Sequence, residues 1–265
     1  MVSILLMYSL IGVVAGLLAG LLGIGGGLVI VPMLMFGFHR QGITDAHAMH
    51  LALGTSMASI VFTSISSARA HHRRGAVDWS VVRRIVLGIL LGTLLGSFVA
   101  ASLSNRSLIV LFVIFLYYVA TQMLLGRKPK ASRVLPGRVG MFGVGNGIGM
   151  VSSLVGIGGG TLSVPFMVLH NLPVHTAIGT SAAIGFPIAV AGTIGYVANG
   201  LRDTGLPPHS VGYIYLPALA GIVVVSVLFA PLGARLAHAL PVEKLKRVFA
   251  LLLYIVGTRM MVNLF

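Results

Sequence analysis

Two apolar stretches of this chain are interrupted by the same run of glycines. Residues 21–32 read LLGIGGGLVIVP, and residues 153–165 read SLVGIGGGTLSVP. Glycine destabilises a helix, because without a Cβ it loses more conformational freedom on folding than any other residue. A hydrophobic stretch of helix length that contains its own helix breaker, and does so in two places, predicts two broken helices.

The rest of the chain consists of long apolar runs. Of its 265 residues, 57% are hydrophobic and only 8% are charged, too few to solvate the surface of a soluble domain. Apolar runs of about 17 to 25 residues recur almost end to end, and a helix of this length crosses roughly 30 Å of hydrocarbon. The sequence therefore predicts an all-α, polytopic membrane protein in a lipid bilayer. The absence of cysteine excludes disulfides and thiolate metal sites.

The basic residues mark the loops. The 18 lysines and arginines give a pI of about 11.3, but they stand between apolar runs and not on one amphipathic face, so no nucleic-acid partner is expected. Lysine and arginine accumulate in cytoplasmic loops, which places loops 71–84 and 126–138 in the cytoplasm. The first apolar segment lacks a basic start and a cleavage site, so we expect it to remain in the mature protein.

Comparison of the chain with itself reveals a duplication. Pairing Leu21 with Leu154, an offset of 133, aligns the two glycine runs and the valine–proline after each. A second block, HLALGTSMA from His50, aligns with HTAIGTSAA from His175 at an offset of 125. The sequence therefore predicts two homologous membrane repeats joined by a basic linker. Their expected bounds are 1–126 for the first repeat, 127–138 for the linker and 139–265 for the second repeat.

Each repeat is predicted to contain one glycine-broken segment and three ordinary spans. A single helix over residues 4–38 would be about 52 Å long, so a hairpin that turns at the glycines fits the membrane better. The broken segments are expected at 4–38 and 139–169, and the ordinary spans at 47–70, 81–103, 107–125, 175–199, 211–238 and 246–264.

The hairpin decides how the repeats are oriented. If the broken segment crosses twice, or dips and returns, each repeat has an odd number of crossings and the repeats are antiparallel. If it crosses once, they are parallel. With the two basic loops inside, the antiparallel arrangement places 14 of the 18 basic residues in the cytoplasm and the parallel one 12. This favours inverted repeats with both termini outside, and the parallel arrangement stays as the alternative.

The glycine breaks suggest an anion site. Consecutive glycines release backbone N–H groups at a depth where an unpaired group costs several kcal/mol, unless protein or a wet cavity satisfies it. A helix that restarts after the break points its N–H donors and positive dipole end into that space. The acidic residues Asp45, Asp78, Asp203 and Glu243 all fall in loops or at span ends, which disfavours a carrier of cations. The alternative is a purely structural turn.

Two further features repeat near the breaks. The sequence GTS places the hydroxyls of Thr55, Ser56, Thr180 and Ser181 within spans. Such hydroxyls either contact a substrate or bond back to their own helix, and both interpretations stay open. His50 and His175 stand four residues before each GTS, and they carry either a coupling proton or no function beyond an interfacial position.

The doubled GIGGG followed by valine and proline, the downstream GTS, the loop HHRRGAVDW and the stretch PLGARLA resemble the sulfite exporter TauE/SafE family of bacterial membrane permeases. The resemblance covers essentially the whole chain. It implies export of small anions, notably sulfite and organosulfonates, by a secondary mechanism across the bacterial cytoplasmic membrane. Hydroxyls directly after the glycines occur only in the second copy. The candidate substrate-binding residues are Gly23, Gly25, Gly26, Gly27, Thr55, Ser56, Gly156, Gly158, Gly159, Gly160, Thr161, Ser163, Thr180 and Ser181.

These observations predict a multi-pass permease that moves a small anion by alternating access. No cofactor or metal site is expected, and the absence of paired carboxylates or a nucleophile–base pair in the spans disfavours an enzyme. The competing hypothesis is a membrane scaffold or assembly partner that transports nothing. A homodimer is possible, and the ladder Gly88, Gly92 and Gly96 is the candidate for a tight helix contact within or between protomers.

Overall fold

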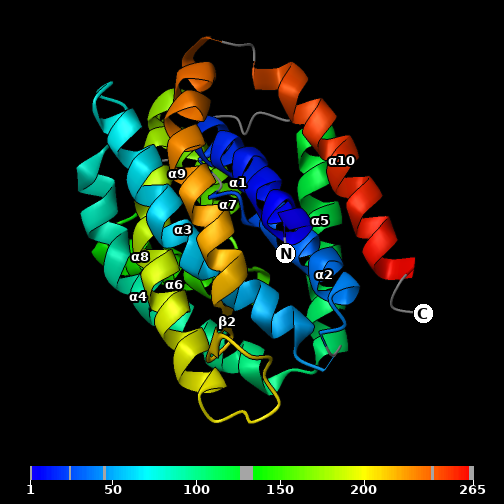
Figure 1. Ribbon diagram of the computed structural model, residues 1–265. Coiled ribbons are helices and arrows are strands. Elements are labelled where there is room, and N and C mark those ends of the chain that lie inside the picture. Colours follow the sequence, from blue (N-terminus) through cyan, green and yellow to red (C-terminus); the bar gives the residue numbers. More distant parts are fainter. Residues whose placement is uncertain (1, 24, 44–45, 126–133, 240–241, 263–265) are drawn as a thin grey trace.

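The computed structural model describes residues 2–23, 25–43, 46–125, 134–239 and 242–262, and these form a bundle of helices (Figure 1). Their only strands are β1 (Ser210–Val211) and β2 (Ile214–Tyr215), which pair as a short antiparallel hairpin. The helices are α1 (Val2–Leu22), α2 (Gly27–Arg40), α3 (Ala48–His72), α4 (Trp79–Ser102), α5 (Asn105–Leu125), α6 (Arg138–Val155), α7 (Gly160–Leu169), α8 (Val174–Gly200), α9 (Leu216–Ala239) and α10 (Val242–Val262).

Five of these helices, α3, α4, α5, α8 and α9, are long and apolar enough to cross a membrane. Together with the helical architecture they confirm the prediction of an all-α polytopic membrane protein. The first ordinary span, expected at 47–70, is observed at 48–72, and the other ordinary spans agree with their helices to within a few residues, apart from the start of α9. That span was expected from residue 211, but the β1–β2 hairpin occupies residues 210–215.

The glycines divide both broken segments at the expected place. The first break separates α1 from α2, and the second separates α6 from α7. Gly23, Gly25 and Gly26 have positive φ angles of 67°, 77° and 81°, and Gly156 and Gly159 have 69° and 79°. Residues with a Cβ rarely adopt these angles, which explains why glycine occupies these positions in each break.

Helices of one predicted repeat pack mainly on helices of the other. α1 packs along α9, and α4 packs along α6. α3 packs on α8, and α5 packs on α10. The glycine ladder of α4 lies within the chain, because Gly88, Gly92 and Gly96 face Phe142, Asn146 and Met150 of α6. The ladder is therefore not available as an interface between protomers.

Helices that the sequence alignment pairs between the two predicted repeats run antiparallel. Gly54 of α3 lies beside Tyr196 of α8, and Ser64 lies beside Gly185, so the two numberings run in opposite directions. In the α5–α10 pair, Tyr117 and Thr258 share a hydrogen bond of 3.0 Å, and Thr121 and Tyr254 share one of 2.6 Å. Inverted repeats require this geometry. Which end faces the cytoplasm stays a prediction.

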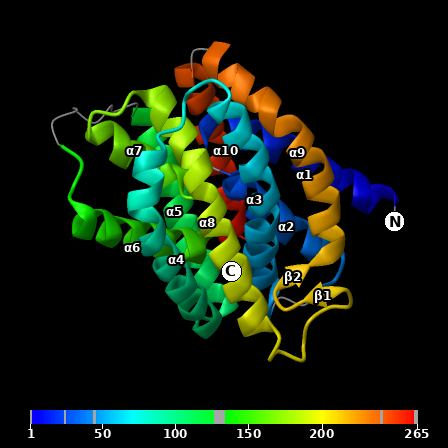
Figure 2. The same cartoon turned by 90° about the vertical axis from the view of Figure 1, so that its left-hand side faces the viewer.

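The two ends of the bundle differ in charge. The loop after α3, at the top in Figures 1 and 2, begins with the exposed residues Arg73 and Arg74. The exposed Arg83 lies in the second turn of α4, which starts at this end. The exposed Arg138 is the first residue of α6, which runs beside α4 in the same direction. The β1–β2 hairpin lies at the opposite end, at the bottom in both views. We call these the basic end and the hairpin end.

Candidate functional site

The two glycine breaks meet in the middle of the bundle. A Cβ added at Gly25 would lie 3.1 Å from the Cα of Gly158 and 3.1 Å from a methyl group of Ile60 on α3. A Cβ added at Gly27 would collide with the carbonyl oxygen of Gly156. Each break therefore approaches the backbone of the other at a distance that only glycine permits.

The GTS sequences join each repeat to a loop of the other. Gly54 packs on the carbonyl of Tyr213 before α9, and Gly179 packs on the carbonyl of Ala76 before α4. Next to these glycines, the Thr55 hydroxyl accepts a hydrogen bond from the Tyr215 amide at 2.9 Å. The Thr180 hydroxyl accepts one from the Asp78 amide, also at 2.9 Å.

The serine of each GTS holds the glycine break of the other repeat. Ser56 donates a hydrogen bond to the carbonyl of Gly156 at 2.8 Å. Ser181 shares its proton between the carbonyl of Gly23 at 3.1 Å and the carbonyl of Ile178 in its own helix at 2.9 Å. Ser56 and Ser181 are fully buried. These hydroxyls satisfy carbonyl groups that the broken helices have released, so they position the breaks.

Among the described residues, unpaired hydroxyls flank the second break and not the first. Ser152 and Ser153 at the end of α6, and Thr161 and Ser163 at the start of α7, bury their oxygens without a hydrogen-bond partner among the described residues. Leaving a buried hydroxyl unpaired costs about 1–3 kcal/mol. At an offset of 133 the first break has alanine, glycine, leucine and isoleucine in these four places. The second break therefore carries four hydrogen-bonding groups that the fold does not use.

The helices that restart at the breaks supply backbone donors. Gly26 and Gly159 precede α2 and α7 as N-caps without a side-chain hydrogen bond. The first amides of α7, those of Gly160 and Thr161, find no acceptor within the described part of the chain. Such amides and the positive end of the helix dipole favour an anion.

No described carboxylate lies at the breaks. Asp78 caps α4, where its side chain accepts from the amides of Ser80 and Val81, and the hydrogen bond from the Ser80 hydroxyl lowers the pKa of this carboxyl. Asp203 lies in the connection between α8 and β1. Asp45 and the side chain of Glu243 fall outside what the structure describes.

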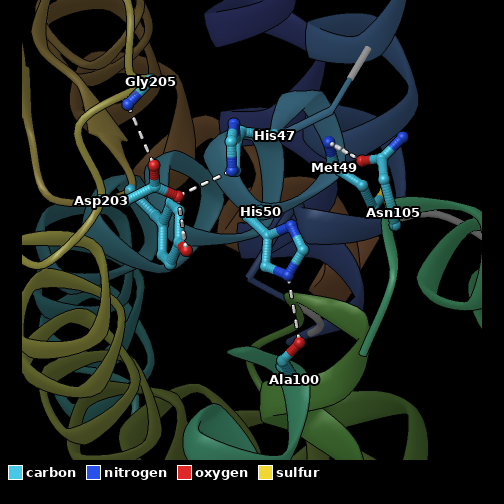
Figure 3. Close-up of polar contacts among 8 residues, drawn as sticks. His47, Met49, His50, Ala100, Asn105, Asp203 and Gly205 are labelled. Atoms are coloured by element: carbon cyan, nitrogen blue, oxygen red, sulfur yellow. Dashed lines mark hydrogen bonds and ion pairs between the residues drawn. The ribbon is translucent and has the colours of Figure 1, made fainter. Parts of the chain in front are cut away.

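The two histidines before the GTS sequences lie in different surroundings. His50 is only 5% exposed, near the hairpin end, whereas His175 is exposed. His50 donates from Nε2 to the carbonyl of Ala100 at 3.1 Å (Figure 3). Its buried Nδ1 has no partner among the described residues. In a neutral ring that donates from Nε2, Nδ1 carries a lone pair and accepts a proton.

An acidic group lies close to His50. His47 Nε2 and Asp203 Oδ2 are 2.7 Å apart, and Tyr213 donates to the same oxygen at 3.1 Å (Figure 3). The Tyr213 ring lies 5.0 Å from the His50 ring, and burial, the largest cause, raises the pKa of Tyr213 to about 12. Sequence reasoning missed His47, Asp203 and Tyr213. The only signal was that Asp203 is one of four acidic residues in the chain.

Known proteins resemble the whole chain. The family model described as "Sulfite exporter TauE/SafE" matches residues 8–260. A probable membrane transporter protein of Haemophilus influenzae is 38% identical over 98% of this chain and 99% of its own length. Another from Methanocaldococcus jannaschii is 26% identical over 95% of this chain and 93% of its own length. No solved structure matches the chain.

Proposed function

The chain belongs to the sulfite exporter TauE/SafE family of membrane transporters, and from this premise we propose that it exports a small anion, such as sulfite or an organosulfonate, by alternating access. The observation that carries the proposal is the second glycine break. There, unused hydroxyls lie at the end of α6 and the start of α7, next to the first amides of α7, and no described carboxylate lies at the break.

The chemistry of this place suits an oxyanion. Sulfite and sulfonate groups present oxygens that only accept hydrogen bonds, while hydroxyls and backbone amides donate them. Hydrogen bonds to a charged partner are stronger than neutral ones, so the site needs no basic side chain. We assign the direct contacts to Thr161, Ser163 and the glycine backbones Gly158, Gly159 and Gly160. The GTS hydroxyls do not contact the anion in this proposal. They position the glycine breaks instead, and they belong to Thr55, Ser56, Thr180 and Ser181.

The membrane potential supplies a driving force. With the cell interior negative, an anion leaves with a gain of roughly 2.3 kcal/mol per charge per 100 mV. We further propose that His50 takes up a coupling proton at Nδ1, because it is the buried histidine of the pair and lies beside His47, Asp203 and Tyr213. His175 is exposed and is the weaker candidate.

Flux in liposomes tests the proposal. Purified protein is reconstituted, a potential is imposed, and the movement of sulfite and of a small sulfonate is followed. We expect Thr161→Val, which removes one hydroxyl and keeps the shape, to raise KM by about 10-fold or more, since a hydrogen bond to a charged group is worth about 1.5–3 kcal/mol. Thr93→Val is the matched control, because Thr93 also buries an unpaired hydroxyl but lies on α4 against Gly149.

Two outcomes would contradict the proposal. If folded protein moves no sulfite, sulfonate or carboxylate at any imposed potential, the transport proposal fails and the scaffold hypothesis takes its place. If Thr93→Val and Thr161→Val weaken transport equally, the second break is not the binding site.

A further inference from the structure

A groove of about 340 Å³ lies between α3 and α9, away from the glycine breaks and toward the basic end. Its walls are apolar, formed by Phe62 and Ile65 of α3 and by Val227 and Pro231 of α9. Phe62 is 47% exposed, so the groove opens on the outer surface of the bundle. Arg69 and Arg73 line the part nearest the end of α3.

The groove is built into the packing of the two helices. Pro231 has no N–H, so the carbonyl of Val227, four residues earlier, loses its helical hydrogen bond. Ser66 of α3 donates to this carbonyl at 2.8 Å and satisfies it. The hydrogen bond joins α3 to α9 at the floor of the groove, and the small side chain of Ala70 leaves space beside it.

Arg69 and Arg73 place two positive charges next to each other. They are four residues apart on α3, so they lie on the same face of the helix, one turn apart. Both are exposed, and within the described part of the chain neither guanidinium has a hydrogen bond or an ion pair. The neighbouring Arg74 differs, because it donates to the carbonyl of Ala70.

The charge is not a consequence of the duplicated architecture. The offset of 125 that pairs His50 with His175 pairs Arg69 with Ile194 and Arg73 with Ala198. Ile194 is 58% exposed on α8, so the equivalent surface of the second repeat is apolar. The first repeat therefore has two cations where its counterpart has the exposed apolar side chains of Ile194 and Ala198.

We propose that this groove binds one anionic phospholipid, with its phosphate at Arg69 and Arg73 and an acyl chain along Phe62, Ile65 and Pro231. The apolar walls face outward from the bundle, so an acyl chain can pack against them. A free small anion would gain no binding energy from apolar walls. Guanidinium groups bind phosphate oxygens in a planar, bidentate geometry. The proposal does not depend on what the protein transports.

Lipid selectivity of the purified protein tests the proposal. The protein is exchanged into mixed micelles that contain phosphatidylglycerol or phosphatidylcholine, and retained lipid is measured by native mass spectrometry together with the melting temperature. We expect phosphatidylglycerol to be retained at least about 10-fold better by the wild type. Arg69→Gln with Arg73→Gln is expected to abolish this preference. Arg83→Gln with Arg138→Gln removes two exposed arginines from the same end but outside the groove, and is expected to keep it.

Several results would overturn the proposal. The wild type could retain both lipids equally, or the two double variants could lose the preference to the same extent, which would indicate a diffuse basic surface. Competition by inorganic phosphate as effective as that by phosphatidylglycerol would make the groove a site for small anions instead. Glutamine keeps a polar side chain without the charge, and a wild-type melting temperature in phosphatidylcholine excludes misfolding as the cause of a lost preference.

Discussion

The middle of the molecule repeats its contacts in both copies, whereas the surroundings of those contacts differ. Thr55 and Thr180 accept from backbone amides of the opposite copy at the same distance of 2.9 Å. His71 and Tyr196, related by the offset of 125, donate to the carbonyls of Gly20 and Ser153 at 2.8 and 2.9 Å.

The two copies differ in groups that can bind a proton or donate a hydrogen bond. His50 is buried near Asp203 while His175 is exposed, and among the described residues unused hydroxyls flank the second break but not the first. The contacts that occur in both copies form the structural frame of the bundle. Because these contacts are the same in the two halves, they do not distinguish one side of the membrane from the other. We therefore attribute function to the places where the copies diverge.

The largest expected effect comes from filling the close contacts of the frame. Gly54→Ala and Gly179→Ala each drive a methyl group into a backbone carbonyl of the opposite copy, and we expect each to destabilise the protein by about 1–3 kcal/mol or more. Thermal unfolding in detergent measures this. Gly143→Ala is the control, because nothing lies within 4 Å of its added Cβ. A large loss of stability at only one of the two glycines would show that the two contacts are not equivalent.

Next in size is the loss of the hydroxyls that hold the breaks. Ser56→Ala leaves the Gly156 carbonyl without its donor, and Ser181→Ala does the same to Gly23. Each unpaired buried carbonyl costs about 1–3 kcal/mol. We expect similar falls in melting temperature for both variants. If Ser56→Ala instead abolishes anion binding at unchanged stability, the serine contacts the substrate itself.

A third prediction separates the two histidines. We expect His50→Gln to remove the dependence of anion flux on external pH and His175→Gln to leave it intact, since of these two histidines only His50 is buried, with no described partner at Nδ1. The measurement is flux in liposomes between pH 5.5 and 8. Equal behaviour of the two variants would remove His50 from the coupling step without affecting the anion site.

The smallest effect is expected at acid pH. The lowered pKa of Asp78 means that its charged form stabilises the folded protein above the ordinary pKa of an aspartate, and that this stabilisation is lost as the pH falls through the folded pKa. The equivalent loop position before α9 is Tyr215, which has no such charge. We therefore expect the melting temperature to fall below about pH 4, and Asp78→Asn to flatten this fall. An unchanged slope in the variant would place the acid sensitivity elsewhere.

Much of the fold could be predicted because each feature has a local cause. The apolar runs give the ordinary helices, and the positive φ angles at Gly23 and Gly156 explain why the sequence breaks its helices there. The all-α fold class is confirmed in this way. The β1–β2 hairpin was not predicted, because its first residues extend an apolar run that reads as part of the next helix.

The site was less predictable because its contacts are distant in sequence. Periodicity places Ser56 and Ser181 inside helices, but it does not show that each hydroxyl reaches the break of the opposite copy. The pairing of His47 with Asp203 likewise depends on how α3 meets the connection after α8. Whether the candidate residues bind an anion stays a prediction.

The exchange of hydrogen bonds between the copies has a consequence for biosynthesis. The Gly23 carbonyl is completed by Ser181, which the ribosome adds much later, so the first half inserts into the membrane with its break unsatisfied. A half-chain made alone lacks these donors, and two halves made as separate polypeptides contain all of them.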